Sequence, residues 1–350
     1  MNDSEEGRGL VAMQSMEIGV NGEDGKTPLP GVDLRWVAMI SVVVLMGVIS
    51  HYYSSPTAEL SYECPAFVRE AENFDKKSFE EEYAQEEKNI TRDTTAWLQN
   101  FRNEGFDSWG HTYDEVKAGM LQFKTEFFPT NIKSGQSIYE SACGIGLNLY
   151  MTLEILQDFG ITDLKVYGNE YLPSSTQKAN VVFDHAAPAS SKKGKLCVGD
   201  STDLSHVPSN AFDLVYTGYV SPLLDPLHFD KGDIDKNYLE YKKLCIAAMK
   251  GDNWKEQKLV ILAQEKQNSF YGKWVAEMVR IAKPGSAVIL EQVSYPYCEE
   301  FWDWGGVNQD WWIPSMAKYG WDVDPSSLEF MDDTLFRHRY HVFMRKNAAI

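Results

Sequence analysis

The segment Ser137-Ile-Tyr-Glu-Ser-Ala-Cys-Gly-Ile-Gly146 is the most informative part of this chain. Its start predicts a short buried strand that ends in an acid, Glu140, and a glycine turn follows. A helical run then extends over 147–159 and stops at Gly160. Gly144 and Gly146 carry no Cβ, so a ligand can approach the backbone closely, and the helix N-terminus offers free N–H groups. The pattern predicts a site for a nucleotide-like ligand.

Four further strands are predicted downstream, at 165–170, 195–204, 211–217 and 287–293, with helical runs between them. Strands that alternate with helices favour crossover connections and a parallel sheet. Two last strands, near 328–331 and 338–344, predict an antiparallel pair joined by an acidic turn. We therefore expect an α/β fold, with a doubly wound, Rossmann-like seven-stranded sheet that ends in a C-terminal antiparallel hairpin.

Acids and glycines recur at the ends of these strands in a definite order. Glu170 closes the second strand, Asp200-Ser201 follows the third, and a Lys-Pro-Gly turn at 283–285 precedes the fifth. Together with the acid and glycines of 140–146, this order resembles the class I S-adenosylmethionine-dependent methyltransferases. A dinucleotide dehydrogenase fits less well, because Leu149 stands where its third glycine is expected.

The resemblance implies an enzyme that uses S-adenosyl-L-methionine, and it assigns roles to residues of the glycine turn. Glu140 would hold the methionine amino group, with Gly144 and Gly146 around it. Glu170 would accept hydrogen bonds from both ribose hydroxyls, since a carboxylate can accept two at once. Ala142 stands where many members have glycine, and we expect its methyl group to be tolerated.

Three more residues belong to the cofactor site that the resemblance implies. Asp200 would accept a bond from the adenine amino group, and the backbone of Ser201 would face the ring. Tyr113, in the pair Tyr113-Asp114, would touch the cofactor, although packing alone also explains a tyrosine there. A single acid at a strand end is usually a turn residue or a helix cap, so the inference rests on the ordered set.

An apolar run without charges extends over 36–53. At ~1.5 Å per residue it spans roughly 27 Å as a helix, near the lower limit for crossing a membrane. A cleaved signal peptide is the first alternative, but the preceding 35 residues are long and acidic, with no basic start. A buried core helix is the second alternative. We expect a single-pass membrane anchor at 36–53, preceded by a disordered acidic tail at 1–35.

The few basic residues near this run predict its orientation. Lys26 and Arg35 precede it, and no Lys or Arg follows it before Arg69. The positive-inside rule then places the N-terminus in the cytosol and the rest of the chain on the other side. A span this short favours the thinner membranes of the endoplasmic reticulum or Golgi.

The remaining chain divides into a stalk and helical cap at 54–133 and a methyltransferase domain at 134–350. The domain holds a long insertion at about 220–270. The whole chain has a net charge of −18 and no stripe of basic residues. Tight binding to a phosphate backbone needs such a stripe, so we expect no nucleic-acid partner.

The five cysteines show neither a C-x-x-C pair nor the spacing of a metal site, and we predict no metal. We interpret Cys143 and Cys197 as small buried residues. Pairing among Cys64, Cys245 and Cys298 stays open.

Two regions are predicted to shape an acceptor site, because both follow the carboxyl ends of strands. One is the insertion, and the other is an aromatic and acidic segment at 295–312. Aromatic faces mixed with carboxylates attract an ammonium group, so we expect an amine or another small cationic molecule as the acceptor. The alternative is that these aromatics only pack the insertion against the sheet.

The catalytic candidates, Tyr219 and His228, lie in the insertion. His228 would be the general base, since its usual pKa suits neutral pH. Positioning alone could also drive transfer from an activated methyl donor.

The expected function is N- or O-methylation of a small molecule by in-line methyl transfer. A protein or polysaccharide methyltransferase of the secretory pathway is the in-class alternative. A cofactor-binding pseudo-enzyme that serves as a scaffold is the alternative of another class.

Overall fold

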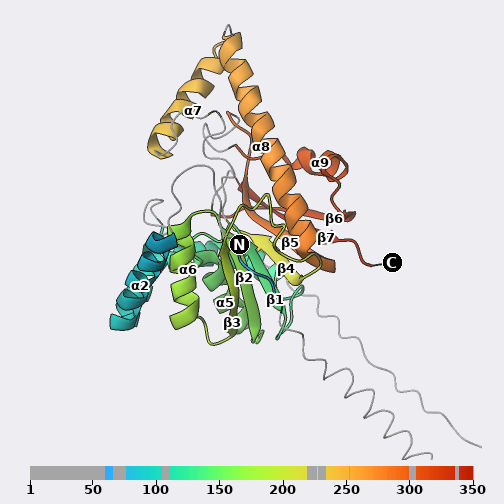
Figure 1. Cartoon of the computed structure of the whole chain (residues 1–350). Coiled ribbons are helices and arrows are strands. Elements are labelled where there is room, and N and C mark those ends of the chain that lie inside the picture. The colour runs from blue at the N-terminus through green and yellow to red at the C-terminus, as the bar shows by residue number, and fades with distance from the viewer. Residues whose placement is uncertain are drawn as a thin grey trace, which may run out of the picture. The chain divides into compact units, whose positions relative to one another are not determined.

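A seven-stranded mixed sheet forms the centre of the computed structural model (Figure 1), which describes residues 60–65, 76–104, 111–218, 227, 234–251, 253–298, 305–335 and 339–349. The strand order is β3-β2-β1-β4-β5-β7-β6. Neighbours from β3 to β5 pair in parallel, and β7 pairs antiparallel with both β5 and β6. The strands are β1 (Ser137–Ser141), β2 (Leu164–Glu170), β3 (Ser191–Val198), β4 (Phe212–Thr217), β5 (Ala282–Ser294), β6 (Val323–Asp332) and β7 (Arg339–Lys346).

This order confirms the predicted doubly wound sheet with a C-terminal antiparallel hairpin. The chain runs outward from β1 to β3 and then returns to the other side of β1 to form β4. Ligands of open α/β sheets bind at such a reversal, beyond the carboxyl ends of the strands. The sheet therefore places the glycine turn after β1 where a ligand is expected.

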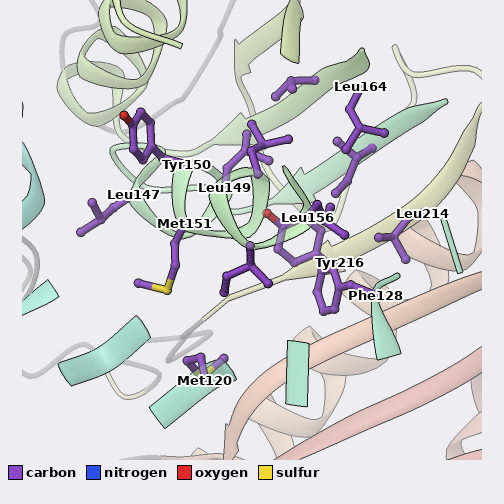
Figure 2. Close-up of a cluster of buried hydrophobic side chains, with 14 of the residues drawn as sticks. Met120, Phe128, Leu147, Leu149, Tyr150, Met151, Leu156, Leu164, Leu214 and Tyr216 are labelled. Carbon is purple, nitrogen blue, oxygen red and sulfur yellow. The ribbon is translucent and has the colours of Figure 1, made fainter. Parts of the chain in front are cut away.

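Helices cover both faces of the sheet, because alternate residues of the buried strands point to opposite sides. Ile138 of β1 joins the core beneath α4, α5 and α6, whereas its neighbour Tyr139 joins the core beneath α8 and α9. Figure 2 shows the first core, in which side chains of α5 such as Leu156 lie close to strand residues. The helices are α4 (Tyr113–Phe127), α5 (Leu147–Asp158), α6 (Pro173–His185), α8 (Trp254–Ile281) and α9 (Trp312–Tyr319).

The helices predicted in the segment before the sheet pack beside it. Helix α2 (Lys76–Arg92) lies against α6, where the Tyr83 hydroxyl donates to Asp184 and Gln177 donates to the carbonyl of Phe79. It is followed by α3 (Thr94–Glu104) and α4, and α4 contacts α5. The predicted tail at 1–35 and membrane anchor at 36–53 lie outside the described residues. Among the residues that are described, no helix has the length and apolar character needed to cross a membrane.

The insertion after β4 forms a helical hairpin of α7 (Ile234–Ala248) and the 28-residue helix α8. Figure 1 shows the two helices meeting at the end of α8 that lies away from the sheet. Helix α8 leads back into β5, and a single 3₁₀ turn, η2 (Gln309–Trp311), follows β5 before α9.

Two disulfides tie distant segments together. Cys245 of α7 is bonded to Cys298, just after β5, so one of the pairings left open does form. Cys64 is bonded to Cys197 in β3, and only Cys143 remains free and buried. Cys197 is buried, as interpreted, but its disulfide bond was not predicted. The segment at 60–65 lies against β3, where Lys195 donates to the carbonyl of Tyr62, and this contact brings the two sulfurs together.

Candidate functional site

The turn after β1 has the backbone conformation that its glycines predict. Ala142, Gly144 and Gly146 have φ values of 56°, 55° and 83°. Gly146 is the N-cap of α5, and a Cβ there would lie 3.1 Å from Cβ of Ala179. A Cβ at Gly144 would meet nothing within 4 Å. Gly144 therefore combines a left-handed backbone conformation with open space beside it, at the place where a ligand is expected.

The left-handed backbone conformation of Ala142 destabilises the fold slightly. An L-residue in the left-handed region loses about 1–2 kcal/mol relative to its ordinary conformation. Its side chain packs against the core beneath α8, which offsets part of that loss. The methyl group is accommodated, but the backbone explains why glycine suits this position better.

Glu140 ends β1 as a buried carboxyl group with 1% of its surface exposed. Its Oε1 accepts a hydrogen bond from Asn148 Nδ2 at 2.7 Å, and its Oε2 has no partner. Burial raises the pKa of Glu140 to about 8, and the bond from Asn148 and the charge of Lys124 oppose that rise. A carboxyl group with one oxygen unpaired and its charge disfavoured is suited to receive a cation.

A buried polar network lies behind Glu140. The amide of Asn148 also donates to Glu291 Oε2 at 2.8 Å, and Glu291 Oε1 lies 2.6 Å from Lys124 Nζ. Both members of this ion pair are fully buried, and Lys124 also donates to Thr152. Within this group, one lysine faces two carboxyl groups, so a bound cation would balance the charge.

Three residues of this network, Asn148, Lys124 and Glu291, were not predicted from the sequence. Asn148 carried a local signal, since it is a polar residue in the first turn of an apolar helix. Lys124 and Glu291 are 167 residues apart, and nothing in the chain predicts that they meet.

Glu170 ends β2 beside the glycine turn. Its Oε2 accepts from the backbone N–H of Gly144 and its Oε1 from that of Leu172, both at 2.9 Å. Burial raises the pKa of Glu170, and the two backbone bonds oppose the shift. Each oxygen keeps a second lone pair, so the predicted bonds to a ribose remain available. The structure adds a second role, because Glu170 links the glycine turn to the start of α6.

Asp200 and Ser201 lie in the turn after β3, next to Glu170. Asp200 is exposed and accepts from the backbone and hydroxyl of Thr202. Ser201 is buried and its hydroxyl accepts from Asn169 Nδ2 at 2.9 Å. Asn169 also donates to the carbonyl of Gly199. This asparagine, which sequence reasoning missed, thus holds the turn at the edge where Glu140 and Glu170 end their strands.

Tyr113 lies at the start of α4 and is largely buried. Its hydroxyl donates to Glu154 Oε2 of α5 at 2.8 Å, and Arg102 and Lys117 bind the same carboxylate. Burial raises the pKa of Tyr113, and so does the charge of Glu154. Burial and the hydrogen bond to Glu154 are enough to explain a tyrosine at this position. The predicted contact of Tyr113 with a cofactor stays a prediction.

The catalytic candidates Tyr219 and His228 lie outside the described residues. The aromatic residues of the segment after β5 that are described pack into cores. Tyr297 stacks on Tyr241 of α7 with ring centres 5.0 Å apart, and Trp312 is buried and donates to Tyr340. Among the described residues, no group of three His, Cys, Asp or Glu side chains is arranged to hold a metal ion.

The residues present fit S-adenosylmethionine on three counts. The free Oε2 of Glu140 matches a cationic amino group, and the space at Gly144 admits a ligand against the backbone. Glu170 and Asp200 end neighbouring strands with unused acceptor capacity. The described residues are therefore chemically compatible with a cationic nucleoside derivative.

Comparisons with known proteins give similarity of fold. No family model matches the chain, and no curated protein matches its sequence. A SAM-dependent methyltransferase from Aquifex aeolicus is similar at 12% identity and a TM-score of 0.36, over 66% of this chain and 89% of that one.

A SAM-dependent methyltransferase from Methanosarcina mazei has 10% identity and a TM-score of 0.37, over 63% of this chain and 96% of its own. Phosphoethanolamine N-methyltransferase 2 from Haemonchus contortus, in complex with S-adenosyl-L-methionine, has 13% identity and a TM-score of 0.38, over 65% and 53%. At identities and TM-scores this low, the neighbours say nothing about what this chain acts on.

Proposed function

We propose that this protein is an S-adenosylmethionine-dependent methyltransferase that methylates a small molecule at nitrogen or oxygen. The observation that carries the proposal is Glu140, a buried carboxyl group with one unpaired oxygen beside a left-handed glycine turn. Glu140 would hold the amino group of the cofactor, Glu170 its ribose, and Asp200 its adenine. When bound, the cofactor supplies a methyl group on an already activated sulfonium.

The acceptor in this proposal is a small molecule that contains an amine. The α7–α8 hairpin and the segment after β5, both predicted to shape the acceptor site, are joined by the Cys245–Cys298 disulfide and the Tyr241–Tyr297 stack. This supports a single wall beside the cofactor site, since β5 ends at the same edge of the sheet as β1. His228 is proposed as the general base and Tyr219 as a residue that positions the acceptor.

The proposed location is the secretory pathway, with a membrane anchor at 36–53, a cytosolic N-terminus and a lumenal catalytic domain. The two disulfides support this location, because disulfides persist in the endoplasmic reticulum and beyond but are rare in the cytosol. A lumenal enzyme would need its methyl donor delivered across the membrane.

The first experiment is thermal unfolding of the full chain with and without S-adenosylhomocysteine. A ligand at about 100 times its dissociation constant should stabilise the protein by roughly 2.7 kcal/mol and raise the melting temperature. Glu140→Gln, which keeps the size of the side chain, should abolish most of the rise. Glu170→Ala should weaken binding too, by roughly 2–3 kcal/mol, but it also loosens the glycine turn. A well-folded protein that shows no rise contradicts the proposal.

A methyl-transfer assay then separates the alternatives. Labelled product with a member of an amine panel supports the small-molecule enzyme. Labelling only of protein or polysaccharide acceptors identifies the larger-substrate alternative. Cofactor binding without any labelled product favours the scaffold.

A further inference from the structure

The α7–α8 hairpin exposes large apolar side chains on its outer side. On α8, Trp254 and Ile261 are 58% and 57% exposed, and Leu262 is exposed as well. On α7 and the turn after it, Ile246 is exposed and Met249 is 64% exposed. Elsewhere in the described chain, exposed side chains of this size are scattered singly, as is ordinary for a protein surface. Here they gather on one hairpin.

Helical spacing places these residues on one stripe of each helix. On α8, Trp254, Ile261 and Leu262 are separated by seven and eight residues, which is two turns. On α7, Leu239 and Ile246 have the same separation. We call these two stripes, together with Met249, the hairpin face.

The opposite side of the hairpin is occupied by the fold itself. Tyr241, Leu244 and Ala263 form a small buried cluster with Tyr297. Gln264 Nε2 donates to the carbonyl of Gly306, and Cys245 is bonded to Cys298. The hairpin is thus attached by its inner side, and the hairpin face is directed away from the attachment.

Lysines are interspersed along the hairpin face. Lys243 and Lys250 follow the stripe of α7, and Lys258 lies on that of α8. Between residues 239 and 262 the chain has five lysines against three acids, whereas the whole chain has 33 Lys and Arg against 51 Asp and Glu. The hairpin is therefore a basic region on a strongly acidic protein.

Trp254 lies where the two helices meet, with Lys258 Nζ 4.8 Å and Lys255 Nζ 5.9 Å from the centre of its ring. An amphipathic ring flanked by long basic side chains suits the boundary between lipid headgroups and acyl chains. The apolar residues would enter that boundary and the lysines would meet anionic headgroups.

We propose that the hairpin face binds an anionic lipid surface. The surroundings of Trp254 favour anionic lipid as the occupant, since Lys255 and Lys258 lie beside a ring that suits the boundary between headgroups and acyl chains. Contact with lipid at the hairpin would place the wall of the proposed acceptor site at the membrane surface. The proposal does not depend on which reaction the site performs, and it competes with the lumenal location proposed above, because anionic lipid is characteristic of the cytosolic leaflet.

The test must be local to the hairpin, because residues 36–53 are predicted to bind membrane by themselves. The full chain is mixed with vesicles of phosphatidylcholine alone, or of phosphatidylcholine with phosphatidylserine. Hydrogen exchange is followed in peptides that cover 239–262. Quenching of tryptophan fluorescence by brominated lipids is measured for the native chain and for Trp254→Phe, whose difference isolates Trp254.

We expect slower exchange of these peptides and quenching of Trp254 with the phosphatidylserine vesicles. Lys255→Gln with Lys258→Gln should weaken both effects, by roughly fivefold in affinity for each lysine. Trp254→Ser with Ile261→Ser should remove them. Ile313→Ser on α9 is the matched control, since Ile313 is 51% exposed but lies outside the hairpin, and it should change neither.

Three results would overturn the proposal. The first is unchanged exchange at 239–262 with every vesicle, and the second is equal quenching of the native chain and Trp254→Phe. The third is protection without vesicles that grows with protein concentration, which would identify a second copy as the partner. If Trp254→Ser with Ile261→Ser unfolds, the lysine pair still decides, because these side chains are exposed and their removal leaves the buried cluster intact.

Discussion

Glu140 couples the proposed ligand site to the stability of the fold. Its pKa is raised from an ordinary value of 4.5 to about 8 by burial. The folded state therefore holds a proton that the unfolded state has lost between these two values, and stability falls as the pH rises through that window. A bound cation reverses the preference, since it favours the ionised carboxylate.

We predict that Glu140→Gln separates the two effects. Without a ligand, the variant should lose less stability than the native chain between pH 5 and about 8, because it has no charge to bury. Its affinity for S-adenosylhomocysteine should be lower, and the rise of affinity with pH that we expect of the native chain should be absent. Melting curves and calorimetric titrations at several pH values check this. Equal pH dependence in both proteins would show that Glu140 does not titrate in this range.

At the scale of the element, the turn between β1 and α5 contains two glycines, and different structural constraints favour glycine at each position. Gly146 caps α5 and lies too close to Ala179 for a Cβ to fit without movement. At Gly144 only the left-handed backbone conformation favours glycine, since a Cβ there would meet no other atom.

The substitutions Gly144→Ala and Gly146→Ala form a matched pair. Gly144→Ala should cost about 1–2 kcal/mol of stability from backbone strain alone, and it should weaken cofactor binding by filling the open space. Gly146→Ala adds a steric contact to the same strain and should destabilise the fold more. Denaturant unfolding and ligand titration of both variants measure the difference. A Gly144→Ala protein that binds the cofactor normally would place the ligand elsewhere.

At the scale of the whole molecule, the disulfides close long loops. Cys64 and Cys197 are 133 residues apart, and Cys245 and Cys298 are 53 apart. In the chain-entropy model, cross-links of these lengths contribute about 5 and about 4 kcal/mol by restricting the unfolded chain.

Replacing both cysteines of a disulfide with serine should lower the melting temperature. The decrease should be larger for Cys64 and Cys197 than for Cys245 and Cys298. Cys143→Ala is the control, because it removes a buried thiol without removing a cross-link. Loss of Cys245 and Cys298 should also raise hydrogen exchange in α7, whereas loss of Cys64 and Cys197 should leave α7 unchanged. Native stability that survives reduction of both bonds would contradict the cross-links, and with them the support for an oxidising compartment.

The sequence by itself determined the sheet and the position of the proposed ligand site. Strand, acid, glycine turn and helix follow one another within 137–159, and each is dictated by local chemistry. Alternating strands and helices then leave few ways to arrange a parallel sheet. Glu140, Gly144, Gly146 and Glu170 were therefore predictable as neighbours at one edge.

Only the tertiary structure decided what surrounds that edge. The Lys124–Glu291 pair, the bridge from Asn148 to Glu291 and the Cys64–Cys197 bond join residues 133 to 167 positions apart. The aromatic residues near β5 were expected beside an acceptor, yet Tyr297 and Trp312 fill cores. Residue type alone does not reveal these roles. Long-range contacts depend on how the helices pack against the sheet, because close packing, and not local conformational preference, selects the partners of each buried side chain.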